Sequence, residues 1–417
     1  MKILIWHGYL LGGTGSNVYT RSLARAWSRQ GHEVVVLCQD RHPERYDLGG
    51  ALVVRPEIGP HLPVFVLDNY EAVRPRLLQD LTRPQLDDYV ARNAAAIREQ
   101  LPADFLLANH VLLGAPVGAA AGLPFAVKAH GSELEFSMRG RPWLGAWARE
   151  TLSTAQAVIA GSEHIVRVLH EVVGEGDYIE RVRLGPPGVD IEEFQPHDRP
   201  TALRLLIEES RRDAPNPGGT DQRRPDEGNA ERFASFFAED RPTAVYVGKL
   251  STEKGVSLLV DAVGRLDLRL VVVGFGPARR ELEQAADDSV LFTGPLEHRH
   301  LAHLWPLADV SVVPSVFPEA FGMVAAEAAS CGSPPLVARH SGLAEVAAAL
   351  EVEYPSEHRH LASFDNGDVD DLTAKLAELV SLSRPQWQAV SDAARRTVVA
   401  NWSWEHVAAT ITDLMAS

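Results

Sequence analysis

The chain has 417 residues, of which 45% are hydrophobic and 23% are charged, and its formal net charge is −16. These values predict a globular protein of two or three domains. The acidic balance excludes a general nucleic-acid binder, because such proteins need a basic surface.

The cysteines and the first residues bear on the compartment. Cys38 and Cys331 are the two cysteines, too few for a disulfide framework, and apolar neighbours predict that both are buried. Residues 1–6 are predicted to form a strand too short for the apolar region of a signal peptide. No apolar run approaches the roughly 20 residues of a membrane helix. We therefore expect a cytoplasmic protein whose membrane contact is at most peripheral, at the inner membrane face.

Short apolar runs alternate with helical patterns along the chain, which predicts parallel sheets with crossover helices. The strands expected in the first half are residues 2–6, 33–38, 51–55, 105–108, 125–128, 157–160 and 181–184. Those expected in the second half are residues 244–247, 269–273, 290–293, 310–313 and 335–338. Each half is thus predicted to be a doubly wound α/β domain.

Glycines and prolines at 185–188 predict the joint between the two halves. We expect a first domain over residues 1–188, a second over 189–397, and a last helix over 398–417 that crosses back to the first. A polar stretch at about 197–241 is interpreted as a surface insertion. Its ends are helix-like, at 201–211 and 229–238, and its middle is predicted to be mobile.

A glycine-rich loop that contains Gly12 and Gly13 follows the first strand and precedes a helix. Glycines let backbone amides approach a phosphate, and a helix N-terminus favours negative charge. A dinucleotide fingerprint started at Gly13 has Val18 where the third glycine belongs, although Asp40 could hold a ribose as in a dehydrogenase. A plain turn is an equally good interpretation of this loop alone.

Two further strand ends carry candidate polar groups. Lys249 and Lys254 follow the strand at 244–247, where lysines can neutralise a diphosphate as point charges; a solvated loop is the alternative. His130 follows the strand at 125–128 and could hydrogen-bond a sugar hydroxyl or carry a proton. Ser132 or Glu133 beside it could instead cap the next helix.

Glu319 and Glu327 are separated by seven residues and follow the strand at 310–313. The first is expected on a loop at the carboxyl end of that strand, and the second on the helix that follows. Ligands of open α/β sheets bind in the crevice at the carboxyl ends of the strands. Two carboxylates there can accept hydrogen bonds from sugar or ribose hydroxyls, and Gly322 at the helix N-terminus suits a phosphate.

No metal site is predicted. Asp368 and Asp370 have the form of a metal-binding Asp-x-Asp, but their place before a helical pattern favours helix capping. The histidines at 298, 300 and 303 lack the spacing and the acid of a zinc site.

Taken in order, these motifs resemble those of the retaining glycosyltransferases of the GT-B fold in family 4 (GT4), over nearly the whole chain. The matching segments are the glycine loop before Ser16, residues 130–133, 187–190, 248–255 and 274–277, and Glu319 with Glu327. The resemblance implies an α/β protein of two doubly wound Rossmann-like domains facing a cleft. It also implies transfer of a hexose-type sugar, with retention, from a UDP- or GDP-linked donor to a small-molecule or lipid-linked hydroxyl acceptor.

The resemblance also implies residue roles. Glu327 is expected to bind the ribose of the donor. The residues implied for the diphosphate are Gly12, Gly13, Lys249 and Lys254, and those implied for the donor sugar are His130, Glu319, Phe321, Gly322 and Met323. Its catalytic residues would be Glu319, His130 and Lys254, with Glu319 positioning the sugar and the leaving phosphate assisting deprotonation of the acceptor. No metal or other cofactor is expected, because the lysines and the helix dipole stabilise the leaving diphosphate.

The chain departs from the family pattern at three places. Lys249 stands where arginine is common, which keeps the charge and loses the bidentate fork. Pro187 stands where asparagine is common, and the insertion is not part of the usual pattern. A nucleotide-sugar epimerase or phosphorylase on the same fold, and a non-catalytic nucleotide-sugar-binding subunit, are the alternatives.

Overall fold

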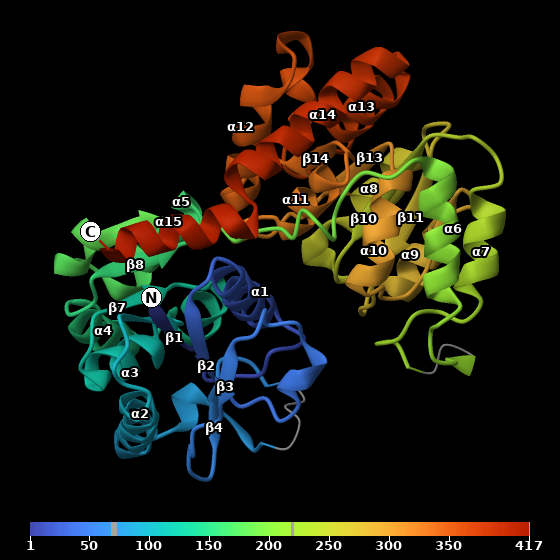
Figure 1. Cartoon of the computed structure of the whole chain (residues 1–417). Coiled ribbons are helices and arrows are strands. Elements are labelled where there is room, and N and C mark those ends of the chain that lie inside the picture. Colours follow the sequence, from blue (N-terminus) through green and yellow to red (C-terminus); the bar gives the residue numbers. More distant parts are fainter. Residues whose placement is uncertain (68–72, 218–220, 417) are drawn as a thin grey trace. The chain divides into compact units, whose positions relative to one another are not determined.

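The computed structural model describes residues 1–67, 73–217 and 221–416. The chain divides into two compact units (Figure 1). The first unit consists of Met1–Gly188 and Trp404–Ser417, and the second of Val189–Ser403. The chain returns to the first unit at Trp404, where the last helix starts, and the helix before it ends at Asn401. Each unit is described by itself.

The first unit is built on a parallel sheet in the order β3-β2-β1-β6-β7-β8-β9. Its strands are β1 (Lys2–Trp6), β2 (Glu33–Leu37), β3 (Leu52–Val54), β6 (Phe105–Asn109), β7 (Phe125–Lys128), β8 (Ala157–Ala160) and β9 (Val182–Leu184). The central strand β1 pairs with both β2 and β6, so that Ile3 lies opposite Val34 and Phe105. Its side chains are buried on both faces, as expected where helices cover a parallel sheet. All strands expected in this half are present.

The helices of the first unit lie between these strands in the sequence, except for the last one, which follows the second unit. They are α1 (Gly15–Arg29), α2 (Arg83–Arg98), α3 (Gly114–Ala121), α4 (Pro142–Leu152), α5 (Glu163–Val173) and α15 (Trp404–Ala416). The last of them packs on α1, far away in the sequence (Figure 1). Trp27 on α1 donates its indole N–H to the Ala408 carbonyl at 3.0 Å and to the Thr412 hydroxyl at 2.9 Å. A small separate sheet, β4 (Leu62–Val64) with β5 (Pro75–Leu77), was not expected.

The second unit is built on a parallel sheet in the order β12-β11-β10-β13-β14-β15. Its strands are β10 (Thr243–Val247), β11 (Arg269–Val273), β12 (Val290–Phe292), β13 (Val310–Val313), β14 (Pro335–Ala338) and β15 (Ser363–Phe364). The strands expected here are all present, and β15 is an additional one of two residues. The switch in strand order lies at β10, which has β11 on one side and β13 on the other. Ligands of such sheets bind outside the carboxyl ends of the strands at that point.

The helices of the second unit are α6 (Arg199–Ser210), α7 (Asn229–Phe236), α8 (Val256–Val263), α9 (Arg279–Ala285), α10 (His298–Leu304), α11 (Met323–Ser330), α12 (Ser341–Glu353), α13 (Val369–Ser381) and α14 (Arg384–Asn401). The first two of them, α6 and α7, belong to the insertion. Ala202, Leu206 and Phe233 of α6 and α7 are fully buried in the core of this unit. The helices of the insertion are therefore part of the domain. The predicted mobility of its middle stays a prediction, and residues 218–220 lie outside the described chain.

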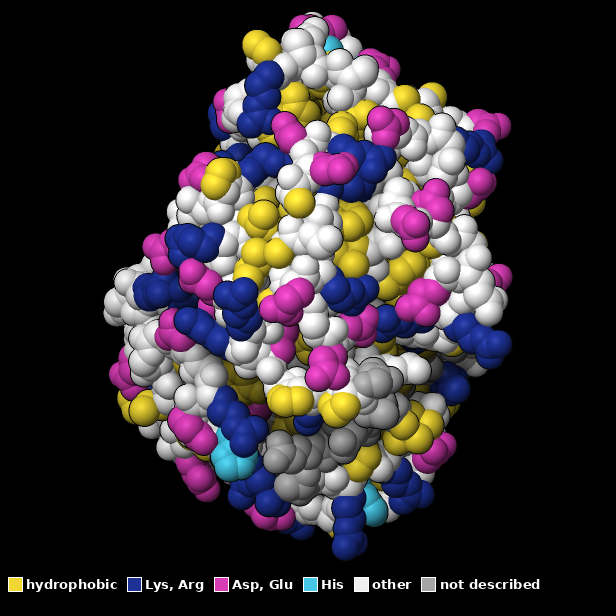
Figure 2. Space-filling view, turned by 90° about the vertical axis from the view of Figure 1, so that its right-hand side faces the viewer, with side chains coloured by type: hydrophobic (Ala, Val, Ile, Leu, Met, Phe, Trp, Pro, Cys, Tyr) yellow, Lys and Arg dark blue, Asp and Glu magenta, His cyan; other side chains and the backbone are white. Residues whose placement is uncertain are grey.

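The face drawn in Figure 2 carries charged side chains of both signs. On the face drawn in Figure 2, the described Lys and Arg side chains alternate with Asp and Glu, and neither sign forms a continuous field. Both cysteines are buried, as expected. In the parts of the chain that the structure describes, no helix combines the length and the hydropathy needed to cross a lipid bilayer.

Candidate active site

The lysine loop, defined as residues 248–255 after β10, is seated on the loop that follows the neighbouring strand β13. Gly255 has a φ of +64°, and a Cβ atom there would lie 1.9 Å from the Pro314 carbonyl oxygen. The Glu253 carbonyl accepts hydrogen bonds from the backbone N–H groups of Val316, at 2.9 Å, and Phe317, at 3.1 Å. Only glycine allows so close an approach. The contact brings Lys254 to the start of the segment that carries Glu319.

Lys254 and Glu319 form an ion pair between the Nζ and Oε1 atoms. Both side chains are partly exposed, at 32% and 23%. The backbone of Glu319 is held by α12, because its N–H donates to the Ser341 hydroxyl at 2.9 Å and its carbonyl accepts from the Gly342 N–H at 3.0 Å. The backbone of Glu319 is thus held in place by α12. The ammonium group of Lys254 is paired with the Glu319 carboxylate at the carboxyl edge of the sheet, where both side chains are partly exposed.

Lys249 lies on the same loop with an exposed side chain. Its carbonyl accepts from the Tyr246 hydroxyl at 2.9 Å, which fixes the backbone and leaves the ammonium group in solvent. Gly274, after β11, packs so tightly here that a Cβ would lie 1.8 Å from the Gly248 carbonyl oxygen. Gly276 approaches the Leu250 carbonyl in the same way. The two glycines therefore serve the packing of adjacent loops.

The segment Phe321, Gly322 and Met323 leads into α11. The ring of Phe321 is buried and meets the Trp402 ring edge to face, with centroids 5.2 Å apart. Gly322 has a φ of +129°, and a Cβ there would lie 2.8 Å from the Leu343 side chain. Met323 is the first helical residue and is partly buried. The first-turn N–H groups of a helix have no intrahelical partner and suit an anion, so this segment offers backbone donors.

Glu327 lies on α11 with its side chain 9% exposed. Among the described residues, its ion-pair partner is His298 at the start of α10, with Nε2 3.9 Å from Oε1. Burial, together with the charge of Glu193, raises the pKa of Glu327 to about 8. The buried carboxyl group is therefore neutral at pH 7 and has no short hydrogen bond within the described chain. A ligand hydroxyl would satisfy it.

Gly12 and Gly13 lie in the first unit, on the loop between β1 and α1. Asn17 donates its side-chain N–H to the Gly12 carbonyl, and its amide oxygen lies 2.7 Å from Nε2 of His7. Gly13 has a φ of +94°, which favours glycine. Asp40 accepts from the Leu11 N–H at 2.9 Å. Because Asp40 holds this loop, the ribose role considered for a dehydrogenase has no support here.

His130 follows β7 in the same unit and is partly buried. Its Nε2 lies 2.9 Å from the Asn109 amide oxygen, and its ring centroid lies 4.6 Å from that of His110. Burial, and the neighbouring basic groups second, lower the pKa of His130 well below the usual range for histidine. The imidazole is neutral at pH 7, so it can exchange hydrogen bonds with a sugar hydroxyl but carries no charge.

Glu133 has a different role from the expected helix cap. It is fully buried, and its Oε1 accepts from the backbone N–H groups of His130, at 2.8 Å, and Val111, at 3.2 Å. Its Oε2 lies 3.1 Å from Nδ1 of His110. Glu133 thus fixes two histidines at neighbouring strand ends. Ser132 makes no capping hydrogen bond through its side chain.

Several polar residues of these sites were not predicted. Glu133 was considered only as a cap, and His298 only as a zinc ligand, which was set aside. The others were not considered for any ligand: His7, Asn17, Asn109, His110, Glu193 and Ser341. One signal was available, because His7, His110 and His130 each follow the carboxyl end of a strand. Asp368 caps α13 as expected, accepting from the backbone N–H groups of Asp370 and Asp371. The described residues contain no cluster of ligands suited to a metal ion.

Comparison with solved structures shows the fold of the chain. The chain matches a sucrose-phosphate synthase from Thermosynechococcus elongatus with a TM-score of 0.68 and 21% identity, over 100% of this chain and 98% of that one. It matches Anabaena HepE, solved with UDP and glucose, with a TM-score of 0.69 and 18% identity over the whole of both chains. At these identities the likeness shows the fold, which is the GT-B fold with two Rossmann-like domains, as predicted.

Sequence comparison gives the family. The family model "Glycosyltransferase Family 4" matches residues 13–193, and "Glycosyl transferases group 1" matches residues 228–397. The chain belongs to the family 4 glycosyltransferases, as its motifs predicted.

The curated relatives are glycosyltransferases of several substrates. A D-inositol 3-phosphate glycosyltransferase from Xylanimonas cellulosilytica is 33% identical over 207 residues, 46% of this chain and 44% of the relative. A GDP-mannose-dependent α-(1-6)-phosphatidylinositol dimannoside mannosyltransferase from Mycobacterium tuberculosis is 40% identical over 109 residues, 24% of this chain and 28% of the relative. The chain therefore matches less than half the length of each of these relatives.

Proposed function

We propose that the protein is a retaining glycosyltransferase that moves a hexose-type sugar from a UDP- or GDP-linked donor to a hydroxyl group of a small-molecule or lipid-linked acceptor. The observation that carries this proposal is the Lys254–Glu319 ion pair, which joins the segments that follow the neighbouring strands β10 and β13 in the second unit. Lys249 lies on the first of these segments, and Glu327 lies on α11 after the second. This edge offers cations for a diphosphate and carboxylates for hydroxyl groups. The family and the names of its relatives agree with a nucleotide-sugar donor.

Each residue has a proposed task. Lys249 and Lys254 neutralise the diphosphate, and Glu327 accepts hydrogen bonds from the ribose hydroxyls. Glu319 holds hydroxyls of the donor sugar, assisted by the backbone N–H groups at the start of α11. The neutral imidazole of His130 is proposed to hydrogen-bond the same sugar, and the Gly12-Gly13 loop to add backbone donors to the diphosphate.

The proposed reaction takes place on one face of the sugar. The bond from the anomeric carbon to the diphosphate oxygen breaks, a bond to the acceptor oxygen forms, and the acceptor proton passes to an oxygen of the leaving phosphate. The lysines stabilise the charge that develops on that group. In this scheme no metal ion is needed, and Glu319 positions the sugar without acting as a base.

Replacement of Lys254 by alanine tests the proposal. We expect Lys254→Ala and Glu319→Gln each to lower the rate of sugar transfer by about 10²-fold or more. Lys254→Ala removes a proposed contact to the leaving diphosphate, and Glu319→Gln weakens a proposed contact to the donor sugar. The rate is measured as released nucleoside diphosphate and as glycosylated acceptor. Lys2→Ala is the matched control, since Lys2 pairs with Glu33 on the first unit, at 3.3 Å, and has no proposed task at the donor site.

Other results would overturn the proposal. Transfer at the wild-type rate by Lys254→Ala would contradict the assigned roles. An epimerised nucleotide sugar formed without any acceptor would indicate an epimerase. Donor binding without turnover across many acceptors would indicate a non-catalytic subunit.

A further inference from the structure

We propose that the described parts of the insertion, residues 197–217 and 221–241, are a positioning element of the donor site, and that through Asp213 they determine which nucleotide base the site prefers. This inference rests on the proposed function. It concerns the base loop, defined as residues 293–297 between β12 and α10, together with His298, the first residue of α10.

The base loop lies next to the carboxyl group proposed to hold the ribose. His298 reaches within 3.9 Å of Glu327, and its ring packs on the edge of Phe194 with centroids 5.4 Å apart. A nucleotide with its ribose on Glu327 extends its diphosphate toward Lys254. In this pose the base would lie at the other end of the ribose, on the side where His298 borders Glu327. The base loop would then border the base, and its shape would decide which bases fit.

The insertion holds the backbone of the base loop directly. The Thr293 carbonyl accepts from the Asp226 N–H at 2.9 Å and from the Asn229 side chain at 2.8 Å. Arg232 donates to the Phe292 carbonyl at 2.6 Å. Gly294 has a φ of +69°, and a Cβ there would lie 2.7 Å from the Asp226 carboxylate. The loop and the insertion are packed against each other without room for a side chain.

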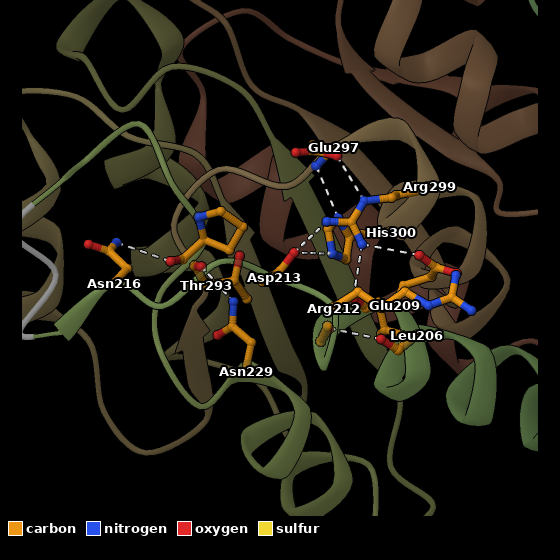
Figure 3. Close-up of polar contacts among 12 residues, drawn as sticks. Leu206, Glu209, Arg212, Asp213, Asn216, Asn229, Thr293, Glu297, Arg299 and His300 are labelled. Carbon is orange, nitrogen blue, oxygen red and sulfur yellow. Dashed lines mark hydrogen bonds and ion pairs between the residues drawn. The ribbon is translucent and has the colours of Figure 1, made fainter. Parts of the chain in front are cut away.

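Asp213 holds the far end of the loop. Its Oδ1 accepts from Nη2 of Arg299 and lies 3.0 Å from Nε2 of His300, which is fully buried (Figure 3). The Glu297 N–H donates to Nδ1 of His300 at 3.2 Å, so the ring hydrogen of the neutral imidazole is on Nε2. Asp213 thus contacts both Arg299 and His300, and His300 accepts the hydrogen bond from Glu297 at the end of the loop.

Arg299 joins the same two elements. Its Nη1 donates to the Glu209 carbonyl at 2.9 Å, on α6, and its Nε to the Glu297 carboxylate at 2.8 Å, on the base loop. The network in Figure 3 therefore connects the insertion with both ends of the base loop. A change at Asp213 is transmitted to His298, which follows Glu297 and precedes Arg299.

The test uses the full-length protein with Asp213→Asn, and with Arg299→Lys as a second variant that keeps the charge and loses the fork. The dissociation constants of UDP, GDP and ADP and the donor KM and kcat are measured. We expect a donor KM raised by about tenfold, a kcat within about twofold, and a preference among the three nucleotides reduced by about fivefold or more. A purely structural role would lower activity without changing the preference.

Asp309→Asn is the matched control. Asp309 pairs with Arg199 at the start of the insertion and accepts from the Thr243 N–H at 2.9 Å, at the amino-terminal end of β10. It is expected to lower thermal stability and to leave the nucleotide preference unchanged. An unchanged preference in both Asp213→Asn and Arg299→Lys would overturn the inference, as would an equal change in Asp309→Asn. A wild-type protein that binds none of the three nucleotides would instead overturn the proposed function.

Discussion

Burial shifts the pKa values of Glu327 and His130 in opposite directions, and both shifts favour the neutral form of the side chain. It raises the pKa of the carboxyl group to about 8 and lowers the pKa of the imidazole well below the usual range, so both groups are neutral at pH 7. The sequence singles out both residues as candidates, because both stand in recognisable motifs. Their ionisation could not, since it depends on which side chains pack around them in the fold.

The pKa of Glu327 predicts how donor affinity depends on pH. Ribose hydroxyls that donate to the carboxylate stabilise its charged form, so the pKa falls on binding and a proton is released. The pKa of the Glu327 carboxyl group without ligand is about 8, so below that pH the donor can bind the carboxylate only if this proton is released. The donor Kd is therefore expected to fall as pH rises from about 6 to about 8, by up to about tenfold per pH unit. Calorimetric titration in buffers of different ionisation enthalpy measures both the Kd and the proton release.

Glu327→Gln is the control for this dependence. Its side chain does not titrate, so the slope of Kd against pH in that range should disappear. An equally steep slope in Glu327→Gln would assign the pH dependence to another group, and a flat wild-type profile would contradict the ribose role of Glu327.

The lysine loop is the element that carries both lysines of the proposed donor site. The loop packs against the backbone of Pro314 at Gly255. The positive φ of Gly255 and its close contact with the Pro314 carbonyl exclude any side chain there. The elements themselves could be predicted: every strand expected from the sequence is present. The strand β15 was missed because it has two residues, and β4 and β5 were missed because each contains a proline, which argues against a strand.

Gly255→Ala is expected to destabilise the protein and weaken donor binding together. The new Cβ would require both a strained backbone and displacement of the Pro314 carbonyl, for which we expect a loss of about 1–3 kcal/mol in the free energy of unfolding. Denaturant unfolding and nucleotide titration measure the two effects. Gly264→Ala, at the other end of α8, is the matched control, because Gly264 has a φ of −60° and its nearest neighbour would be 3.5 Å away.

The control should lie within about 1 kcal/mol of the wild type, on the stabilising side where the backbone is compatible with alanine. If Gly255→Ala were as stable as Gly264→Ala and bound nucleotide as well, the loop would not be held by the contact seen here.

At the scale of the whole molecule, the sequence predicts the two Rossmann-like domains and the family, and less of how distant segments meet. Lys254 and Glu319 are 65 residues apart and pair only because β10 and β13 are neighbours in the sheet. Asp213 and His300 come together through the packing of α6 on α10. Such contacts follow from strand order and helix packing, and a single sequence without periodic signal at these positions does not reveal them.

The central claim is that the carboxyl edge of the second unit's sheet binds a nucleoside diphosphate through Lys254. Calorimetric titration of UDP and GDP into the wild type and Lys254→Ala, at pH 8, tests it most directly. The account predicts a saturable one-to-one complex with at least one of these nucleotides, weakened by about 10²-fold in Lys254→Ala. Equal affinity in the two proteins, or no binding of either nucleotide by the wild type, would contradict it.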